Sequence, residues 1–243
     1  MRSTLDITRL TLKRSDTFSL HIPKLQTYRN EIVCITGPNG SGKTSLVECI
    51  VGLANPLGSL TVNGRPITAN LKHTKRVIGY VPDDEAWLIA ELCAQEYFAL
   101  LQHVYERAGV SIDMGKTMLV LANTLHFTAW KQQLASLSHG NKKKVQIIAG
   151  LMHQPDVIVV DELRNGLDPL AIIAAEQILR QQAARGATVI AATHDLWWAE
   201  RLANRIVLLV DGKMAVNQKT KTIVARYGSV EQLFIEQTAK GGA

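Results

Sequence analysis

The order of apolar and polar residues along the chain predicts alternating β-strands and α-helices. Near the start, short runs in which apolar and polar residues alternate occupy 5–12, 18–22 and 31–36, with Pro23 and Asn30 as breaks. A period of two is typical of strands, and residues of these two types often end them. The first 36 residues therefore predict three successive strands.

A helix is predicted soon after the third strand. Apolar residues from Leu46 to Leu53 recur at i, i+3, i+4 and i+7, which marks one face of a helix, and Asn55-Pro56 ends it. Residues 59–68 then predict a strand and a turn at Asn63-Gly64.

The rest of the chain predicts a helical insert followed by alternating helices and strands. The stretch 84–135 has a mainly helical pattern, and 145–152 carries another apolar helical stripe. The fully apolar run 157–160 and the run 188–193 suit buried parallel strands, with a helix that begins at Asp168-Pro169 between them. This alternation predicts an α/β fold whose ligands bind at the carboxyl ends of parallel strands.

Composition narrows the functional classes. The chain has 243 residues, 47% of them hydrophobic, and a formal net charge of +6, which suits an anionic ligand. Basic residues interleaved with aromatic ones are lacking, so no nucleic-acid partner is expected. The start of the chain has no apolar signal segment, and no stretch approaches the roughly 18 apolar residues of a membrane span. We therefore expect one soluble unit that reaches a membrane only through another chain.

Residues 37–44, GPNGSGKT, match the phosphate-binding pattern G-x-x-x-x-G-K-[ST], between a predicted strand and a predicted helix. In such a loop the backbone N–H groups surround a phosphate, Lys43 reaches the β- and γ-phosphate oxygens, and the Thr44 hydroxyl binds Mg²⁺. A merely structural glycine-rich turn would not need this full pattern. The predicted nucleotide-binding residues here are Gly37, Pro38, Asn39, Gly40, Ser41, Gly42, Lys43, Thr44 and Ser45.

Two other predicted strands end in residues that suit phosphate chemistry. Asp161 and Glu162 follow the apolar run 157–160. Two carboxylates at the end of a buried strand need a partner of opposite charge, and beside a phosphate loop that partner is expected to be Mg²⁺. Asp161 is the predicted metal ligand, and Glu162 is placed to orient and deprotonate the attacking water. His194 follows the next strand and could donate to a γ-phosphate, although a lone strand-end histidine is more often structural.

Together these segments resemble the nucleotide-binding subunits of ATP-binding cassette (ABC) proteins over essentially the whole chain. GPNGSGKT resembles their Walker A motif, VIVVDE their Walker B with the catalytic glutamate, NGLDP their D-loop and ATHD their switch-histidine segment, while SLSHGNKKKV occupies the place of the signature. The resemblance implies a P-loop NTPase (RecA-like) core with a mainly parallel sheet, an N-terminal antiparallel β subdomain and an inserted helical subdomain. The expected division is 1–82 and 155–243 for the core and 83–154 for the helical subdomain.

The resemblance also implies a mechanism. Two subunits would pair head to tail, so that Ser138 and Gly140 of one chain contact the γ-phosphate held by the other, with Asp168 of the D-loop also at the nucleotide. ATP would join the subunits and its hydrolysis, with Glu162, His194 and Lys43 as catalytic residues, would release them. The expected cofactors are ATP and Mg²⁺.

Several positions depart from the family pattern. Asp83 stands where glutamine is usual, and as a shorter and charged group it is a further candidate Mg²⁺ ligand. His139 replaces a glycine and Asn141 a glutamine in the signature, and the adjacent lysines 142–144 are expected to be solvated or attracted to the nucleotide at long range. Leu163 and Arg164 replace a common proline and threonine. For adenine stacking Phe18 is the nearest candidate, and a core role suits it better.

The favoured function is the ATPase subunit of an ABC exporter that serves a separate membrane permease, peripheral on the cytoplasmic face of the membrane. GNKKKV and the closing stretch 228–238 resemble segments of drug and antibiotic exporter ATPases. The alternative is a soluble ABC ATPase that acts in macromolecular or cofactor-scaffold assembly. A P-loop kinase ranks last, because it would leave the signature, NGLDP and ATHD segments without roles.

Overall fold

The computed structural model describes residues 3–67 and 72–241, in which ten strands form one continuous sheet of order β5-β4-β1-β2-β10-β9-β3-β8-β7-β6. Parallel pairing joins β9, β3, β8, β7 and β6, whereas β1, β2, β4 and β5 pair in antiparallel fashion. The expected parallel core with an N-terminal antiparallel part is thus confirmed. The strands are β1 Leu5–Lys13, β2 Ser19–Thr27, β3 Ile32–Thr36, β4 Leu57–Val62, β5 Arg65–Pro66, β6 Ile78–Val81, β7 Val157–Asp161, β8 Thr188–Ala192, β9 Arg205–Val210 and β10 Lys213–Lys219.

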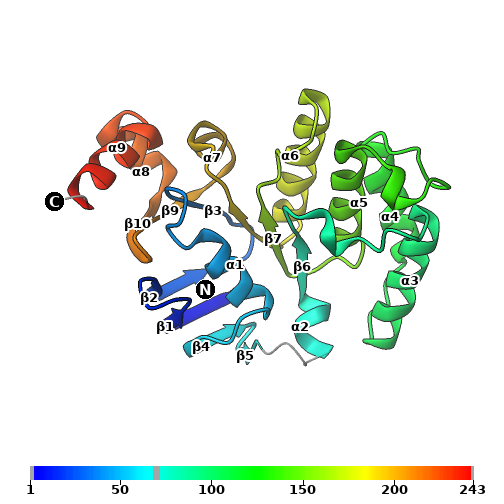
Figure 1. Ribbon diagram of the computed structural model, residues 1–243, viewed down its shortest axis with the longest axis horizontal. Coiled ribbons are helices and arrows are strands. Elements are labelled where there is room, and N and C mark those ends of the chain that lie inside the picture. The colour runs from blue at the N-terminus through cyan, green and yellow to red at the C-terminus, as the bar shows by residue number, and fades with distance from the viewer. Residues whose placement is uncertain (1–2, 68–71, 242–243) are drawn as a thin grey trace.

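Helices gather at the two ends of the molecule and along the parallel strands. In Figure 1, α3, α4 and α5 lie together at one end, α8 and α9 lie at the other, and the antiparallel strands lie below α1. The interval between β6 and β7 thus forms a helical group, as the pattern of 84–135 predicted. The helices are α1 Lys43–Val51, α2 Lys72–Val77, α3 Ala94–Arg107, α4 Met114–Thr124, α5 His139–Leu151, α6 Pro169–Ala184, α7 Leu196–Leu202, α8 Thr220–Tyr227 and α9 Val230–Gly241.

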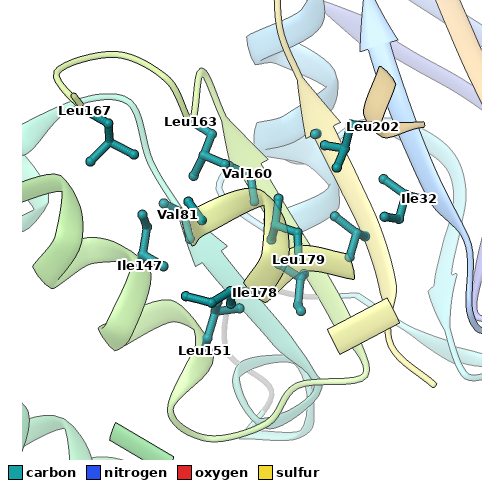
Figure 2. Close-up of a cluster of buried hydrophobic side chains, with 14 of the residues drawn as sticks. Ile32, Val81, Ile147, Leu151, Val160, Leu163, Leu167, Ile178, Leu179 and Leu202 are labelled. Carbon is teal, nitrogen blue, oxygen red and sulfur yellow. The ribbon is translucent and has the colours of Figure 1, made fainter. Parts of the chain in front are cut away.

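The parallel strands are buried on both faces, which explains their uninterrupted apolar sequence. In β7, Ile158 and Val160 face one hydrophobic cluster, and Val157 and Val159 face the other. The first cluster includes side chains of α5 and α6, and the second includes those of α1 and the antiparallel strands. Figure 2 shows part of the first cluster, in which side chains of α5 and α6 point toward β6 and β7. Burial on both faces requires an uninterrupted apolar run, and the polar residues that follow each run lie where the strand leaves the core.

Two details of the N-terminal part differ from or complete the sequence prediction. Pro23 does not end its strand, because β2 continues to Thr27. Arg9, opposite Pro23 in the register, adopts φ 51° and interrupts the ladder there, so the missing proline N–H costs little. Asn63-Gly64 forms the predicted turn between β4 and β5, while Thr68, the last residue of that predicted stretch, lies outside the described residues.

Candidate nucleotide-binding site

The predicted site residues lie at the carboxyl ends of four adjacent parallel strands. In the order β3-β8-β7-β6, Ile35 pairs with Ala192, Ala192 with Asp161, and Val160 with Val81. The loop after β3, the acidic pair at the end of β7, His194 after β8 and Asp83 after β6 therefore leave the sheet at nearly the same height. The structure brings these predicted groups to one edge, the usual ligand position in a parallel sheet.

The loop between β3 and α1 is closed around its own lysine. Lys43 is 9% exposed, and its Nζ donates to the carbonyl oxygens of Gly37 (2.9 Å) and Pro38 (3.0 Å). Burial lowers the pKa of Lys43, and the nearby Glu162 and Asp161 partly offset this effect. The ammonium group is thus held inside the loop by groups that a phosphate can replace.

Glycine is required in this loop for two physical reasons. A Cβ on Gly37 would lie 2.3 Å from the Leu209 carbonyl oxygen and 2.5 Å from Ser41 Oγ, so no side chain fits there. Gly42 precedes α1 with φ 101°, a left-handed conformation that few other residues tolerate. Ser41 Oγ is buried and has no hydrogen-bond partner within the described structure. The loop therefore holds a buried hydroxyl group that is free to bind a ligand beside the N-terminus of α1.

Asp161 and Glu162 differ in environment although they are neighbours. Asp161 is 6% exposed, and burial raises its pKa to about 6, with further contributions from the negative charges of Glu162 and Asp83. Lys143 and Lys43 oppose this rise. A carboxylate in this position is stabilised by any additional cation at the strand ends.

Glu162 is held by the residues that follow β8. Its Oε2 accepts from Thr193 Oγ1 (3.1 Å), and its Oε1 accepts from the His194 backbone N–H (3.1 Å) and lies 2.9 Å from His194 Nδ1. The Glu162 backbone has φ 43° and its N–H donates to the Ala192 carbonyl at 3.0 Å. The ends of β7 and β8 are thus in direct contact, which the sequence did not predict, and the His194 side chain remains 63% exposed.

The other predicted binding residues lie at helix starts. Ser138 caps α5 by accepting from the Asn141 N–H at 3.3 Å, and Asp168 caps α6 by accepting from the Ala171 N–H at 2.9 Å. Both cap residues are exposed, and Gly140 lies in the first turn of α5 with its backbone close to the Gly166 carbonyl. Their geometry gives each a local role in its own helix and leaves them open to a neighbouring molecule.

Comparison with known proteins decides the family. The family model described as "ABC transporter" matches residues 20–165, a segment that includes the phosphate loop, the start of α5 and the acidic pair. The chain belongs to the ABC transporter family. Its structure is similar to one described as the ATP-binding subunit of an ABC transporter, with a TM-score of 0.88, 27% identity and coverage of 97% of this chain and 100% of the other. A nucleotide-free ATP-binding cassette, at 20% identity and a TM-score of 0.75, supports the fold alone.

Related ABC proteins extend beyond this chain to different degrees. A Nod factor export ATP-binding protein I of Burkholderia thailandensis is 28% identical over 201 residues, which are 78% of this chain and 62% of that protein. Its counterpart in Burkholderia orbicola is 30% identical, and the match covers 74% of this chain and 59% of that protein. The chain thus spans about three-fifths of the length of these relatives. An uncharacterised ABC transporter ATP-binding protein of Methanocaldococcus jannaschii is 28% identical, with shares of 96% and 84%.

The departures of this ABC protein from the family pattern have structural partners. Leu163 is buried in the first hydrophobic cluster, and Arg164 forms an ion pair with Asp195. His139 turns its ring toward Glu85 and covers Gly166, where a Cβ would collide with that ring. The replaced positions are thus integrated into local packing.

The signature lysines are the main correction to the sequence analysis. Lys143 is buried, with a 2% exposed side chain, and Lys142 pairs with Glu85 at 2.8 Å, so these two are not solvated as expected. Burial lowers the pKa of Lys143, and the charges of Asp83 and Asp161 partly offset this. Lys143 and Gln146, three residues apart on α5, are both buried, and the basic run 142–144 gave no sequence signal of this.

Two groups beside the phosphate loop complete the picture. Phe18 lies against Gly42, where a Cβ would be 3.1 Å from its ring, and also packs on the second hydrophobic cluster. Arg14 Nε donates to Ser45 Oγ at 3.2 Å, and its guanidinium pairs with Glu48. Sequence reasoning missed Arg14, because its position beside the loop depends on the pairing of β1 and β2.

Across the described ranges, no helix is long and apolar enough to cross a bilayer.

Proposed function

We propose that this chain binds and hydrolyses ATP as the nucleotide-binding subunit of an ABC transporter, with export as the favoured direction. The observation that carries the proposal is the convergence of the phosphate loop, Asp161, Glu162 and His194 at the ends of three adjacent strands. Family membership and the exporter names of related ATP-binding proteins support it.

The phosphate loop would hold the triphosphate. The backbone N–H groups of residues 37–45 and the N-terminal end of α1 would bind its oxygens, as in other loops of this pattern. Lys43 would exchange its two carbonyl contacts for the β- and γ-phosphate oxygens. Because Lys43 is already buried at the loop, little side-chain ordering would accompany binding.

The residues at the strand ends fit Mg²⁺. The donor set is a hydroxyl of Thr44 and carboxylates of Asp161 and Asp83, the hard oxygen ligands that this ion prefers. Burial raises the pKa of Asp161, the nearby carboxylates of Glu162 and Asp83 add to this rise, and a divalent cation would relieve their repulsion. When bound, Mg²⁺ would neutralise negative charge on the phosphate oxygens.

Glu162 would act on the attacking water. Its Oε1 accepts two hydrogen bonds from the segment after β8, so the carboxylate is oriented before substrate arrives. It would position the water in line with the γ-phosphate and accept its proton. His194 would keep Glu162 in place and present the exposed side of its ring to the γ-phosphate.

A second copy or a related ATPase subunit would complete each site. Ser138 and Asp168 are exposed at helix starts and Gly140 is partly exposed in the first turn of α5, and we propose that all three meet the nucleotide of the partner subunit. The positive end of the α5 dipole would then face the γ-phosphate. A site divided between chains explains how hydrolysis can separate them and do work elsewhere.

A permease would bind between the core and the helical group. A cavity of about 480 Å³ lies there, lined by apolar residues of β6 and α3 such as Tyr80, Leu101 and Tyr105, with the end of α1 on its other side. We propose that it receives a cytoplasmic segment of the permease. We propose that residues 1–82 and 155–243 form the core and that residues 83–154 form the helical subdomain.

The test uses Glu162→Gln, which removes the base and keeps the shape of the side chain. With ATP and Mg²⁺, light scattering should show this variant as a dimer, and without nucleotide as a monomer. The double variant Glu162→Gln/Lys43→Ala is the control and should stay monomeric. A Glu162→Gln protein that binds ATP yet stays monomeric at every concentration would refute the shared site. Recovery of the chain with a polytopic membrane protein supports the transporter, whereas a purely soluble complex would support an assembly ATPase.

A further inference from the structure

Lys143 places a charged group in the interior, beneath the carboxyl ends of β6 and β7. Its Nζ donates to the Pro82 carbonyl at 2.8 Å and to the Asp161 carbonyl at 3.4 Å, and it lies 3.7 Å from Asp83 Oδ1. Burial of an ammonium group is unfavourable unless it is hydrogen-bonded and paired. These three contacts therefore fix both the lysine and the backbone edge on which the predicted metal ligands lie.

The same face of α5 holds the whole segment 82–85. Gln146 Nε2 donates to the Asp84 carbonyl at 2.7 Å, and Lys142 and His139 both contact the Glu85 carboxylate. With Lys143, these residues are spaced i, i+3, i+4 and i+7 along the helix, so their side chains share one face. The start of α5, with its capping Ser138, is thus attached to the loop that follows β6.

Asp83 extends this attachment to the turn after β7. Its Oδ1 accepts from Asn165 Nδ2 at 2.9 Å, in addition to the ion pair with Lys143. A chain of three side chains therefore links the start of α5, the loop after β6 and the turn that leads to Asp168. Asp83 is 44% exposed, so it also remains accessible from the strand ends.

We infer that Lys143 is a positioning residue for the nucleotide site. It holds Asp83 between α5 and Asn165, and its charge balances the three carboxylates Asp83, Asp161 and Glu162 at the strand ends. Lys43 lies in the phosphate loop, where it is placed to reach the phosphates, whereas Lys143 lies beneath the carboxylates and donates to the Pro82 and Asp161 carbonyls. The inference rests on the proposed ATP site and adds to it a residue that no phosphate-loop pattern contains.

The test measures ATP affinity by calorimetry in the presence of EDTA, where Mg²⁺ cannot mask the protein's own charges. Lys143→Met keeps the length of the side chain and removes its charge, so ATP should bind about tenfold more weakly because the carboxylates then repel it. Asp83→Asn should bind ATP more tightly than the wild type. The double variant Lys143→Met/Asp83→Asn should return to within about twofold of the wild type. Lys144→Met, on the same helix and less buried, is the matched control and should bind like the wild type.

The outcomes are distinguishable. A double variant as weak as Lys143→Met, or a Lys143→Met protein that binds like the wild type, would overturn the inference, since Asp83→Asn must offset the lost charge if Lys143 balances the carboxylates. If Lys143→Met does not fold, Lys143→Gln keeps a donor for the Pro82 carbonyl, and the same pattern is expected of it. A wild-type chain that binds no ATP refutes the proposed function itself, whereas ATP binding without the compensating pattern refutes only the role of Lys143.

Discussion

His194 contacts Glu162 through both its backbone and its ring. The backbone N–H donates to Oε1 at 3.1 Å, and Nδ1 lies 2.9 Å from the same oxygen. Because β8 and β7 are hydrogen-bonded neighbours, this contact joins the ends of two strands and orients the carboxylate through the protein's own groups. The catalytic pair proposed above is therefore preorganised by the sheet.

Replacement of His194 by alanine should impair hydrolysis more than binding. The ring contact to Oε1 is lost while the backbone N–H and Thr193 still hold the carboxylate, so we expect kcat to fall by roughly 10²-fold and ATP affinity to change little. Steady-state phosphate release and nucleotide titration measure the two effects. His103→Ala, on the exposed side of α3, is the control. Equal loss of affinity and turnover would show that His194 acts mainly in binding.

Asp168 should have two separable roles. Its carboxylate caps α6, so Asp168→Ala should lower the free energy of unfolding by about 1 kcal/mol, whereas Asp168→Asn retains a cap and most of the stability. If Asp168 also meets the partner's nucleotide, the asparagine variant in a Glu162→Gln background should form the ATP-dependent dimer less readily. Urea unfolding without nucleotide and light scattering with it measure the two roles. An asparagine variant that loses as much stability as alanine would contradict the capping argument.

The sequence was sufficient to predict where the proposed catalytic groups lie, because that placement follows from a single rule. Asp161, Glu162 and His194 each follow an apolar run, and parallel strands end at one edge of the sheet. The phosphate loop follows the same rule after β3. The position of the site therefore follows from local sequence patterns once the apolar runs are assigned to parallel strands.

The surroundings of α5 could not be predicted in this way. The lysines 142–144 form a basic run, which in isolation is typical of a solvated helix face. Lys143 is buried only because the segment 82–85, some 60 residues earlier, covers that face of α5. Pro23 was misjudged for a related reason, since its tolerance within β2 depends on Arg9 of the neighbouring strand.

Gly79 should be irreplaceable although its backbone is ordinary. A Cβ at this position of β6 would lie 2.0 Å from the Gly150 carbonyl oxygen and 2.6 Å from Pro155 Cγ, so α5 could not pack at its present distance. Gly79→Ala should therefore lower the free energy of unfolding by roughly 1–3 kcal/mol, as overpacked cores do. Gly115→Ala in α4 is the matched control, since its Cβ would meet only Asp113 Oδ1 at 3.5 Å and alanine favours a helix. Urea unfolding of both variants measures the difference. A Gly79→Ala protein as stable as the wild type would show that α5 can shift to make room for the methyl group.

His153 makes the stability of the protein depend on pH. The side chain is buried, its ring stacks on Tyr105 with 4.0 Å between centroids, and Nε2 lies 3.3 Å from the Ile78 carbonyl oxygen. Burial lowers the pKa of His153 to about 4, and the hydrogen bond to Ile78 opposes this only in part. The folded protein thus resists a proton that the unfolded chain accepts near its ordinary pKa of about 6.5.

The sign of the effect follows from that difference. Above pH 6.5 the imidazole is neutral in both states and its contribution is fully present; between pH 6.5 and 4 the unfolded state binds the proton first, so stability is lost as the pH falls. The loss is on the order of 3 kcal/mol over this window. Urea unfolding of the nucleotide-free protein from pH 7.5 to 4.5 should show His153→Gln with a shallower decline than the wild type, while His103→Gln follows the wild type. Parallel curves for His153→Gln and the wild type would assign the acid sensitivity to other groups, because the only proton uptake removed by this substitution is that of the buried ring.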